Sequence, residues 1–564
     1  MNVDAPLIYW NRVSSIFKTR AGEIGSVTIG IATFGALTNW KILNPLFVRW
    51  LYWGDPSAGY LGWQFFRKTA LLQFPIGASP NYGVGFASSI MYTDSVPLIA
   101  IPLKYISFLL PTNFQYFGLW ILGGFVLQAW FAWKILARFS KSLTLNLFGV
   151  FLITNAPIFV YRLVHDGSGH IGFIGQFLLL WAINNYLEPK STQRNWLKLI
   201  CLTPLISLGL IPMVMSLYVF WLIKNCISDA TSTSKKLLIA ATKLIGSVFL
   251  MLGVMWVCGA LMVSDPSDSG FGIYRTSLTS LFDPKAVNSF SFSKLLPDIG
   301  SIPGTQEGFA FLGTSVIGIV LISCIVIFKI RHPLISKTYA PLVLGSAALG
   351  VFSLSNRISI SQREIFTYPI PEPIMQLIGP FRSSGRFIWP IVYLIMIYGL
   401  IYLSLIIKKS AFWGFGLLIL LLSTQLYESA TIYSHTRMRF AESEFTAQLV
   451  SSKWDQIAQN YDHLIVVPPL NNDPSWFELS LLANKWDMTT NATYLGRIDL
   501  KKFESAATSA QINLETFQFD SRTMYVITNY PLNPMNQIIL EKYGPTSLGH
   551  TKAFSLDGLT VIAP

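Results

Sequence analysis

The sequence has few charges, and acidic residues are the scarcest of them. Only 12% of its 564 residues are charged, whereas 52% are hydrophobic, and this balance excludes an ordinary soluble globular protein. Many apolar runs approach the roughly 20 residues that a helix needs to cross a bilayer. The sequence therefore predicts a polytopic α-helical membrane protein.

Other absences narrow the function. The four cysteines lie in or beside apolar runs without a CxxC pair, so we expect neither a disulfide framework nor a zinc site. Metal-binding motifs such as HExxH are missing, as are dinucleotide and P-loop motifs. We therefore expect no metal, no cofactor and no nucleotide-sugar donor. No internal repeat is visible, which leaves an inverted-repeat transporter without direct support.

The positive charge indicates a topology. The net charge of +13 is spread over short basic clusters between apolar runs, which is the positive-inside pattern, so we expect no nucleic-acid partner. Eleven spans starting from a cytoplasmic N-terminus fit these clusters. They lie at about 24–47, 114–137, 143–161, 171–187, 197–211, 213–228, 238–263, 309–330, 338–355, 387–407 and 411–427.

Two parts of the chain are predicted outside this transmembrane domain of residues 1–429. In the first outer loop, 48–113, the stretch Val96–Leu110 is too short to cross and is expected to lie as a helix in the interface. Residues 430–564 mix charges with apolar stretches at 463–469, 524–530 and 559–564, and a helix-like segment at 442–459. This pattern predicts a small soluble α/β domain, which an odd number of spans places in the periplasm.

The first outer loop carries two acids beside a long apolar sequence. Asp55 and Asp94 are candidate functional residues, because an acid next to hydrocarbon is costly. Alternatively, each caps the helix that follows it, or Asp55 pairs with Arg67 or Lys68. The loop is also rich in aromatic residues that suit a membrane–water boundary, namely Trp63, Phe65, Phe66, Tyr82, Phe86 and Tyr92. The same boundary is expected for Trp53 and Trp389, with stacking on a sugar as the alternative.

Further polar residues gather where spans meet the outer side. They are Arg162, His165, Asp166 and His170 between the third and fourth spans, Glu307 before the eighth, and Arg382 and Arg386 before the tenth. Arginine grips phosphate oxygens through a planar fork of donors, and a separate carboxylate can take a proton from a hydroxyl group. Arg382 and Arg386 are expected on one helical turn; the alternative is that they anchor lipid headgroups. His165 and His170 fit a binding site and satisfied polar ends equally well.

Four segments carry a family resemblance. GDPSAGYLGWQFFR (54–67), PIGASPNYGVGFASSIMYTDSVPL (75–98), QEGFAFLG (306–313) and FRSSGRFIWP (381–390) resemble a bacterial family of uncharacterised polytopic membrane proteins. That family is similar to the GT-C glycosyltransferases, which use polyprenyl-phosphate sugars. The resemblance covers about 25–430 and implies Asp55 as catalytic base and the FRSSGR arginines as phosphate ligands. One departure is Gln176, where a second histidine is expected.

The resulting hypothesis is an inverting glycosyltransferase of the bacterial inner membrane. It would move a sugar from a polyprenyl-phosphate donor to a periplasmic or lipid-linked glycan, such as O-antigen. Asp55 or Asp94 would act as base, and Arg382, Arg386, His170, Arg162, His165 and Glu307 would bind substrate. One alternative is a flippase or transporter, which should place polar residues near mid-membrane. Another is a glycan polymerase or ligase with a polyprenyl-diphosphate donor.

Overall fold

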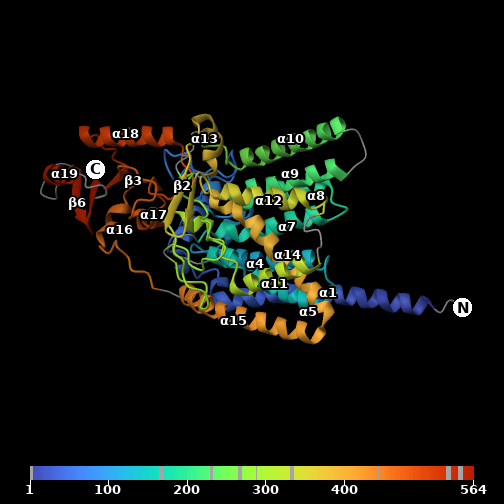
Figure 1. The fold of residues 1–564 in the computed structure, drawn as a ribbon. Coiled ribbons are helices and arrows are strands. Elements are labelled where there is room, and N and C mark those ends of the chain that lie inside the picture. The colour runs from blue at the N-terminus through green and yellow to red at the C-terminus, as the bar shows by residue number, and fades with distance from the viewer. Residues whose placement is uncertain are drawn as a thin grey trace.

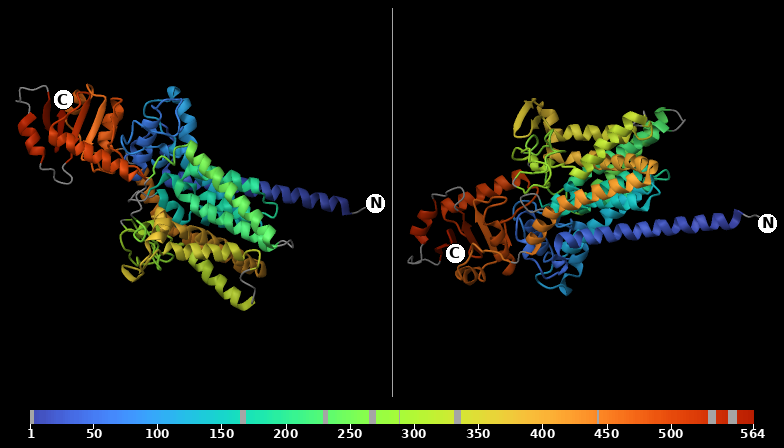
Figure 2. Two further views of the ribbon diagram at one scale, coloured as in Figure 1. Left: turned by 90° about the horizontal axis from the view of Figure 1, so that it is seen from above. Right: turned by 60° about the horizontal axis from the view of Figure 1, so that its bottom comes forward.

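The computed structural model describes residues 4–163, 169–228, 233–264, 270–287, 289–330, 336–441, 444–528, 535–543 and 551–564. A bundle of long helices forms its centre, and a sheet domain from the C-terminal residues covers one end (Figure 1). The first helix, α1 (Asp4–Thr38), projects beyond the opposite end (Figures 1 and 2). The N-terminus and the C-terminal domain therefore lie at opposite ends of the bundle.

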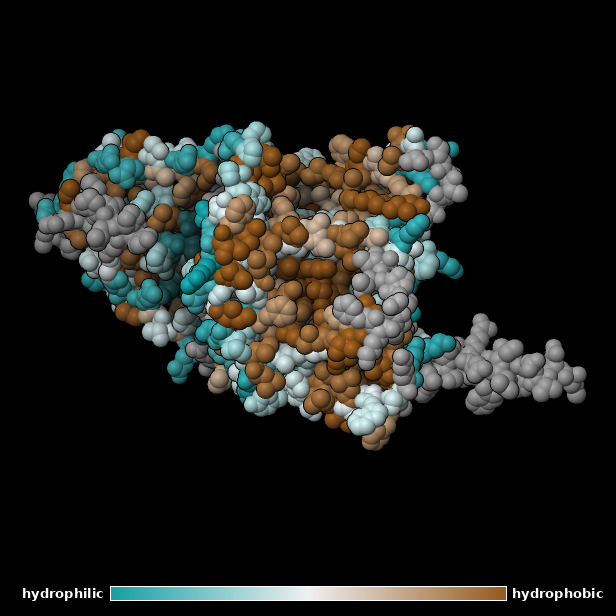
Figure 3. Space-filling view, in the orientation of Figure 1, coloured by the Kyte–Doolittle hydropathy of each residue, from teal (hydrophilic) through white to brown (hydrophobic). Residues whose placement is uncertain are grey.

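Each expected span contains a helix. Besides α1, the bundle helices are α4 (Phe117–Leu136), α5 (Leu143–Thr154) followed by the short α6 (Pro157–Val160), α7 (Phe177–Leu187), α8 (Gln193–Ile206), α9 (Ile211–Ser228), α10 (Thr233–Val257), α11 (Thr314–Ile330), α12 (Ala340–Ser353), α14 (Trp389–Lys409) and α15 (Ala411–Ala441). Within the described residues, seven helices are long and apolar enough to cross a membrane. The hydrophobic surface forms a band over these helices, with hydrophilic residues toward both ends (Figure 3).

Proline sets several helix boundaries. The apolar run 197–228 forms two helices: α8 ends at Ile206, two residues after Pro204, and α9 begins at Ile211, directly before Pro212. The break is sharp because Ser207 adopts an extended conformation. Pro157, which has no N–H to donate to the preceding turn, similarly starts α6 after the end of α5.

The first outer loop folds into a compact cap on the bundle. It contains α2 (Asp55–Phe66) and α3 (Pro97–Tyr105), so the short helix expected within Val96–Leu110 is present. The prediction of boundary aromatics is wrong for the residues of this loop, because Trp63, Phe65, Phe66, Tyr82, Phe86 and Tyr92 are all buried. Trp389 is fully buried as well. These rings form packing cores, in which α2 is buried from Pro56 to Phe66.

The segment between α12 and α14 carries a two-stranded hairpin and one short helix. The strands β1 (Arg357–Ile360) and β2 (Arg363–Thr367) pair antiparallel, and α13 (Glu372–Ile378) follows. A tight 3-10 turn, Gly379–Phe381, then leads to the FRSSGR segment. This segment therefore lies at the same end of the bundle as the C-terminal domain.

The C-terminal domain is the predicted α/β domain. Its five-stranded sheet has the order β4-β3-β5-β7-β6, with β3 parallel to β4 and β5, and β7 antiparallel to β5 and β6. The strands are β3 (His463–Val467), β4 (Thr489–Thr490), β5 (Thr523–Ile527), β6 (Lys552–Leu556) and β7 (Leu559–Ala563), and the helices are α16 (Lys453–Ala458), α17 (Trp476–Lys485), α18 (Leu500–Thr516) and α19 (Met535–Tyr543). The three expected apolar stretches form β3, β5 and β7.

The boundary before this domain differs from the prediction in one detail. Helix α15 continues to Ala441, well beyond the expected end near Tyr427. The helix expected at 442–459 is reduced to α16, because residues 444–452 follow no helical pattern. The chain thus leaves the bundle on a long helix and crosses to the sheet through an irregular segment.

Candidate functional site

The polar residues predicted in separate outer segments meet around one imidazole. His170 Nε2 lies 3.5 Å from Asp55 Oδ2 and 3.5 Å from Glu307 Oε1. On the other side of the ring, His170 Nδ1 is 3.9 Å from Asp94 Oδ2. Three carboxylates from different segments therefore surround one histidine, whose side chain is 22% exposed.

Glu307 is held by two arginines on its second oxygen. Arg162 approaches Glu307 Oε2 at 3.1 Å, and Arg386 Nε donates to the same atom at 2.8 Å. Arg162 is almost completely buried, with its guanidinium 4.9 Å from the ring centre of Trp389. Counting protonated His170, three cations and three carboxylates balance one another in this cluster.

Two glycines allow the QEG and SSGR segments to touch. A Cβ atom on Gly385 would lie 2.7 Å from the Gly308 Cα atom, and one on Gly308 would lie 2.5 Å from the Arg275 carbonyl oxygen. Such distances leave no room for a side chain at either position. The backbone contact brings Glu307 and Arg386, the neighbours of these glycines in sequence, within bonding distance.

Asp94 is bound to the backbone rather than to the helix that follows it. Both of its carboxylate oxygens accept from the Gly172 N–H at 3.2 Å. A Cβ on Gly172 would come within 2.3 Å of Asp94 Oδ1, so a side chain there would displace the Asp94 carboxylate. The capping alternative for Asp94 is wrong, because Val96 is the residue at the start of α3 and provides no side-chain cap.

The alternatives for Asp55 are also not realised. Asp55 is the first residue of α2, after Gly54, and its carboxylate faces His170 and accepts a hydrogen bond from the side chain of Tyr494. Arg67 donates to four backbone carbonyls of residues 107–112. Lys68 pairs with Asp487 at 2.6 Å. The Asp55 carboxylate is thus directed into the site.

Burial and charge act differently on these groups. Burial tends to lower the pKa of His170, but the carboxylates of Asp55 and Glu307 outweigh it and raise the pKa above its usual value. Burial tends to raise the pKa of Glu307, but Arg386 and Arg162 lower it well below its usual range. Burial raises the pKa of Asp94, against the opposing effects of His170 and the Gly172 N–H. The cluster therefore favours a charged histidine and a charged Glu307.

A cavity of about 450 Å³ opens beside this cluster. Asp94, His170, Arg382 and Arg386 line its polar end. Apolar residues from α8, α9 and α10 line the other end, among them Ile206, Ile211, Met251 and Met255. Its volume falls within the roughly 300–1,000 Å³ of small-molecule sites, and its lining is amphiphilic.

The apolar end of the cavity borders the outer surface of the bundle. Only 6% of the most apolar stretch of α10 is buried inside the protein. This helix lies along one edge of the molecule (Figure 1). In a bilayer, most of α10 would face lipid. The cavity therefore connects a charged cluster with an exposed apolar helix.

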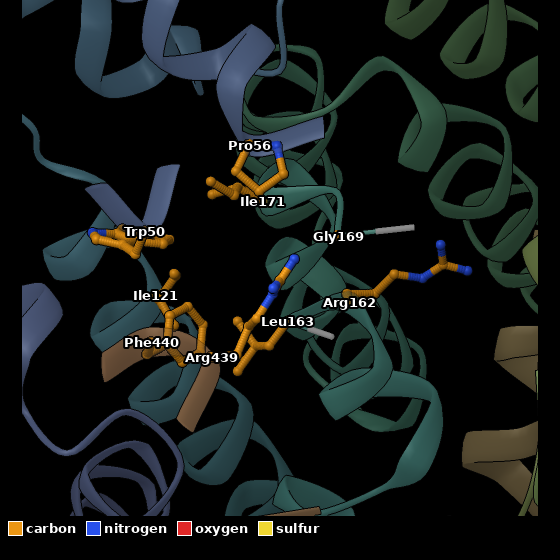
Figure 4. Close-up of a pocket in the computed structure, with 9 residues that line it drawn as sticks. All are labelled: Trp50, Pro56, Ile121, Arg162, Leu163, Gly169, Ile171, Arg439 and Phe440. Carbon is orange, nitrogen blue, oxygen red and sulfur yellow. The ribbon is translucent and has the colours of Figure 1, made fainter. Parts of the chain in front are cut away.

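A second cavity, lined by Pro56 and Arg162, is too small for a substrate. Its volume is about 10 Å³, which accommodates about one water molecule. The Arg439 side chain extends into the space below Pro56, whereas the Arg162 guanidinium points away from it (Figure 4). That guanidinium pairs with Glu307. The larger cavity is therefore the candidate substrate site.

The two FRSSGR arginines reach the cavity in an unexpected way. They do not share one helical turn, because Arg382 ends the turn Gly379–Phe381 and Arg386 lies in the next turn, Ser384–Ile388. Arg386 stacks 4.2 Å from the Phe173 ring centre while bonded to Glu307. Within the described part of the chain, no carboxylate lies within ion-pair distance of Arg382. The two arginines thus differ in how fully their charge is compensated.

The remaining predicted site residues have other positions. Arg162 and Glu307 contact the cluster without lining the large cavity, and Asp55 reaches it through His170. His165 and Asp166 lie outside the described residues. Gln176 bonds Tyr393 and the Ile158 carbonyl in the bundle interior. Among the described residues, no group of three or more His, Cys, Asp or Glu side chains has an arrangement suited to a metal ion.

Sequence reasoning missed two residues, both from the C-terminal domain. Tyr494 bonds Asp55, and Arg497 lines the large cavity with Arg382 and Arg386. No local pattern marks them, because they lie in an irregular segment between β4 and α18. Only the packing of this domain on the first outer loop brings them into the site.

The fold and the site define a polytopic α-helical membrane protein with a cavity that is charged at one end and apolar at the other, and with a C-terminal α/β domain. The chain belongs to a family of unknown function: the model of the domain of unknown function DUF6311 matches residues 27–430, and the DUF6311 C-terminal domain matches 453–563. This confirms the resemblance to an uncharacterised family. No curated protein matches the sequence.

Solved structures with similarity to the chain include the oligosaccharyltransferase of Archaeoglobus fulgidus. Its apo form aligns with a TM-score of 0.44 and 10% identity, over 89% of this chain and 69% of that one. The structure of the archaeal oligosaccharyltransferase AglB with an inhibitory peptide and a dolichol-phosphate aligns with a TM-score of 0.39 and 10% identity, over 95% and 70% of the two chains. Because these TM-scores are below 0.5, a function has to be argued from the site's own geometry.

Proposed function

We propose that this protein is a membrane glycosyltransferase that uses a sugar linked to a polyprenyl phosphate. The observation that supports this proposal is the amphiphilic cavity, which joins arginines, His170 and Asp94 at one end to apolar residues of α8, α9 and α10 at the other. A polyprenyl-phosphate sugar has the same division, with a charged headgroup and a hydrocarbon chain. The four sequence segments that resemble the GT-C-like family contribute most of the charged residues.

In the proposed reaction, an acceptor hydroxyl attacks the anomeric carbon of the donor sugar. The Asp55 carboxylate takes the hydroxyl proton while the acceptor oxygen bonds to the anomeric carbon. The bond from that carbon to the phosphate oxygen breaks, and its electron pair leaves with the polyprenyl phosphate. This single displacement inverts the anomeric centre.

Arginines would stabilise the charge that grows on the departing phosphate. Arg382 is suited to this task, because no described carboxylate competes for its guanidinium. Arg386 shares its charge with Glu307 and would bind phosphate through the rest of its fork. Arg162 and Glu307 would act as positioning residues that hold Arg386 and His170 in place.

Of the two acids, we assign the role of base to Asp55. Asp94 is bound to the Gly172 N–H through both oxygens. We assign Asp94 to orienting His170 at the cavity wall. If Asp94→Asn lost transfer while Asp55→Asn retained it, Asp94 would be the base and Asp55 would orient His170.

Transfer fits the site better than flipping. A flippase should place charged residues along the path through the membrane, whereas the site residues gather where the bundle meets the C-terminal domain. We propose that this end faces the periplasm of a bacterial inner membrane and that the acceptor is a periplasmic or lipid-linked glycan, such as O-antigen. Reporter fusions after Ala441 test the orientation: a periplasmic reporter should be active and a cytoplasmic one silent.

The decisive experiment is a transfer assay with the purified full chain. Radiolabelled sugar on undecaprenyl phosphate is supplied with glycan acceptors, and labelled product and released lipid phosphate are both measured. Equal amounts of the two products support transfer. Lipid phosphate released without glycosylated acceptor indicates hydrolysis, and no release from any donor contradicts the proposal.

A further inference from the structure

The segment Asn491–Asp499 joins β4 to α18 and lies against the first outer loop. Directly before it, the Thr490 carbonyl accepts from the Gly83 and Val84 N–H groups at 2.9 and 3.1 Å, and the Thr490 N–H donates to the Asn81 carbonyl at 3.0 Å. Within the segment, the Gly496 N–H donates to the Tyr92 carbonyl at 2.7 Å. Backbone bonds on both sides of Tyr494 therefore attach the segment to the loop that carries Asp55 and Asp94.

The far end of the segment is anchored just as firmly. Asp499 caps α18 by accepting from the Lys502 N–H at 3.2 Å. Its other carboxylate oxygen accepts from the N–H and the hydroxyl of Ser264 at 2.8 and 2.6 Å. Because Asp499 is fully buried, these bonds hold the segment against the residues that follow α10.

Two side chains of the segment reach the site. Tyr494 donates to the Asp55 carboxylate, and this carboxylate, together with burial, raises the pKa of the Tyr494 hydroxyl, so the tyrosine stays protonated. Arg497 lines the large cavity with Arg382 and Arg386. One of its N–H groups donates to the Pro380 carbonyl at 2.5 Å, two residues before Arg382. The cavity therefore has a third arginine, supplied by a different domain.

We propose that this segment is a functional wall of the site: Arg497 binds the lipid phosphate together with Arg382 and Arg386, and Tyr494 is a positioning residue that orients Asp55. This inference rests on the proposed function and extends it to the C-terminal domain. Arg382, Arg386 and Arg497 all line the same cavity, and guanidinium groups bind phosphate oxygens through their planar fork of donors. A phosphate monoester, the group that leaves during transfer, suits this arrangement.

Arg497 is tested by direct binding of undecaprenyl phosphate to the full chain in detergent. Arg497→Gln keeps an N–H donor for the Pro380 carbonyl but removes the charge. Because a hydrogen bond to a charged group is strong, we expect affinity to fall roughly ten- to hundredfold. The matched control is Arg522→Gln in the same domain, where the arginine pairs with Asp462, and it should bind normally. Unchanged affinity in Arg497→Gln would show that Arg497 serves only as a structural hydrogen-bond donor to the Pro380 carbonyl.

Tyr494 is tested through the separation of turnover from binding. Tyr494→Phe keeps the ring and removes the donor, so kcat should fall about tenfold, as the loss of one hydrogen bond to a charged group implies. Undecaprenyl phosphate should bind normally, because the arginines are untouched. The control is Tyr461→Phe, which loses only a hydrogen bond to the Pro564 carbonyl and should turn over normally. A Tyr494→Phe enzyme with unchanged kcat, or with binding and melting temperature reduced in parallel, contradicts a positioning role.

The two proposals fail in different ways. A wild-type protein that binds undecaprenyl phosphate through Arg497 but transfers no sugar overturns the transfer reaction and supports phosphate binding by Arg497. A wild-type protein that transfers sugar while Arg497→Gln and Tyr494→Phe behave normally overturns the inference alone. Absence of lipid-phosphate binding in the wild type overturns both.

Discussion

The two sides of the candidate site hold their polar groups differently. On the bundle side, Glu307 and Arg162 are buried, and Glu307 has two arginines and His170 within 3.5 Å. On the side of the C-terminal domain, Tyr494 and Arg497 are half-buried side chains of a segment attached through its backbone. Bundle-side variants should therefore affect folding, whereas variants of the other side should affect function alone.

The largest effect is expected where the two sides meet, at Asp55. Asp55→Asn keeps the shape and most hydrogen bonds but cannot accept the proton, so kcat should fall by about 10²–10⁴-fold. Binding of undecaprenyl phosphate should persist, because Arg382, Arg386 and Arg497 are unchanged. A stable Asp55→Asn protein with normal turnover would remove Asp55 from the mechanism.

Replacement of Glu307, on the bundle side, should lower the stability of the fold. Glu307→Ala leaves Arg162 buried without its carboxylate, and breaking a buried ion pair costs about 3–5 kcal/mol. Denaturation in detergent should reveal this loss. The control is Asp298→Ala, which removes a half-exposed partner of Lys285 and should cost about 0–1 kcal/mol. Similar stability of the two variants would indicate that the cluster contributes little to folding.

Arg382 belongs to the bundle side, but its replacement should affect function rather than folding, as expected for residues of the C-terminal domain. Because no described carboxylate pairs with it, Arg382→Ala should fold normally yet bind undecaprenyl phosphate roughly tenfold more weakly. Arg382→Lys should rescue only part of the affinity, since an ammonium lacks the bidentate fork. Arg363→Ala, at an exposed position of β2, is the matched control. Normal binding by Arg382→Ala would favour a headgroup anchor.

The sequence predicted the bundle side of this comparison well. Long apolar runs identified the helices, and the gathering of Asp55, Asp94, His170, Glu307 and Arg386 at the ends of these runs indicated a common site. This succeeded because an unpaired acid or arginine among many apolar residues costs much free energy. Such residues are therefore found mainly in paired, polar sites.

The rest could not be read from local patterns. The aromatic residues of the first loop have a composition that suits both a membrane boundary and a packed core, and only the structure shows that Trp63 and Tyr82 are buried. Tyr494 reaches Asp55 from more than four hundred residues away. Such a contact depends on how two domains pack, for which the sequence of either one carries no periodic signal.

The smallest expected effect is a pH dependence that separates the two sides once more. Since His170 has a raised pKa, its interactions with Asp55, Asp94 and Glu307, weakened by repulsion from Arg386, stabilise the fold most at a pH below about 6.5, the usual value for histidine. This contribution is lost as the pH rises through the higher pKa of the folded state. The melting temperature of the wild type should therefore exceed that of His170→Gln most clearly near pH 6, and the difference should shrink toward pH 9. Tyr494→Phe removes no group that titrates in this range and should follow the wild-type profile. A constant difference between wild type and His170→Gln would mean that the imidazole is neutral in the folded protein throughout this pH range.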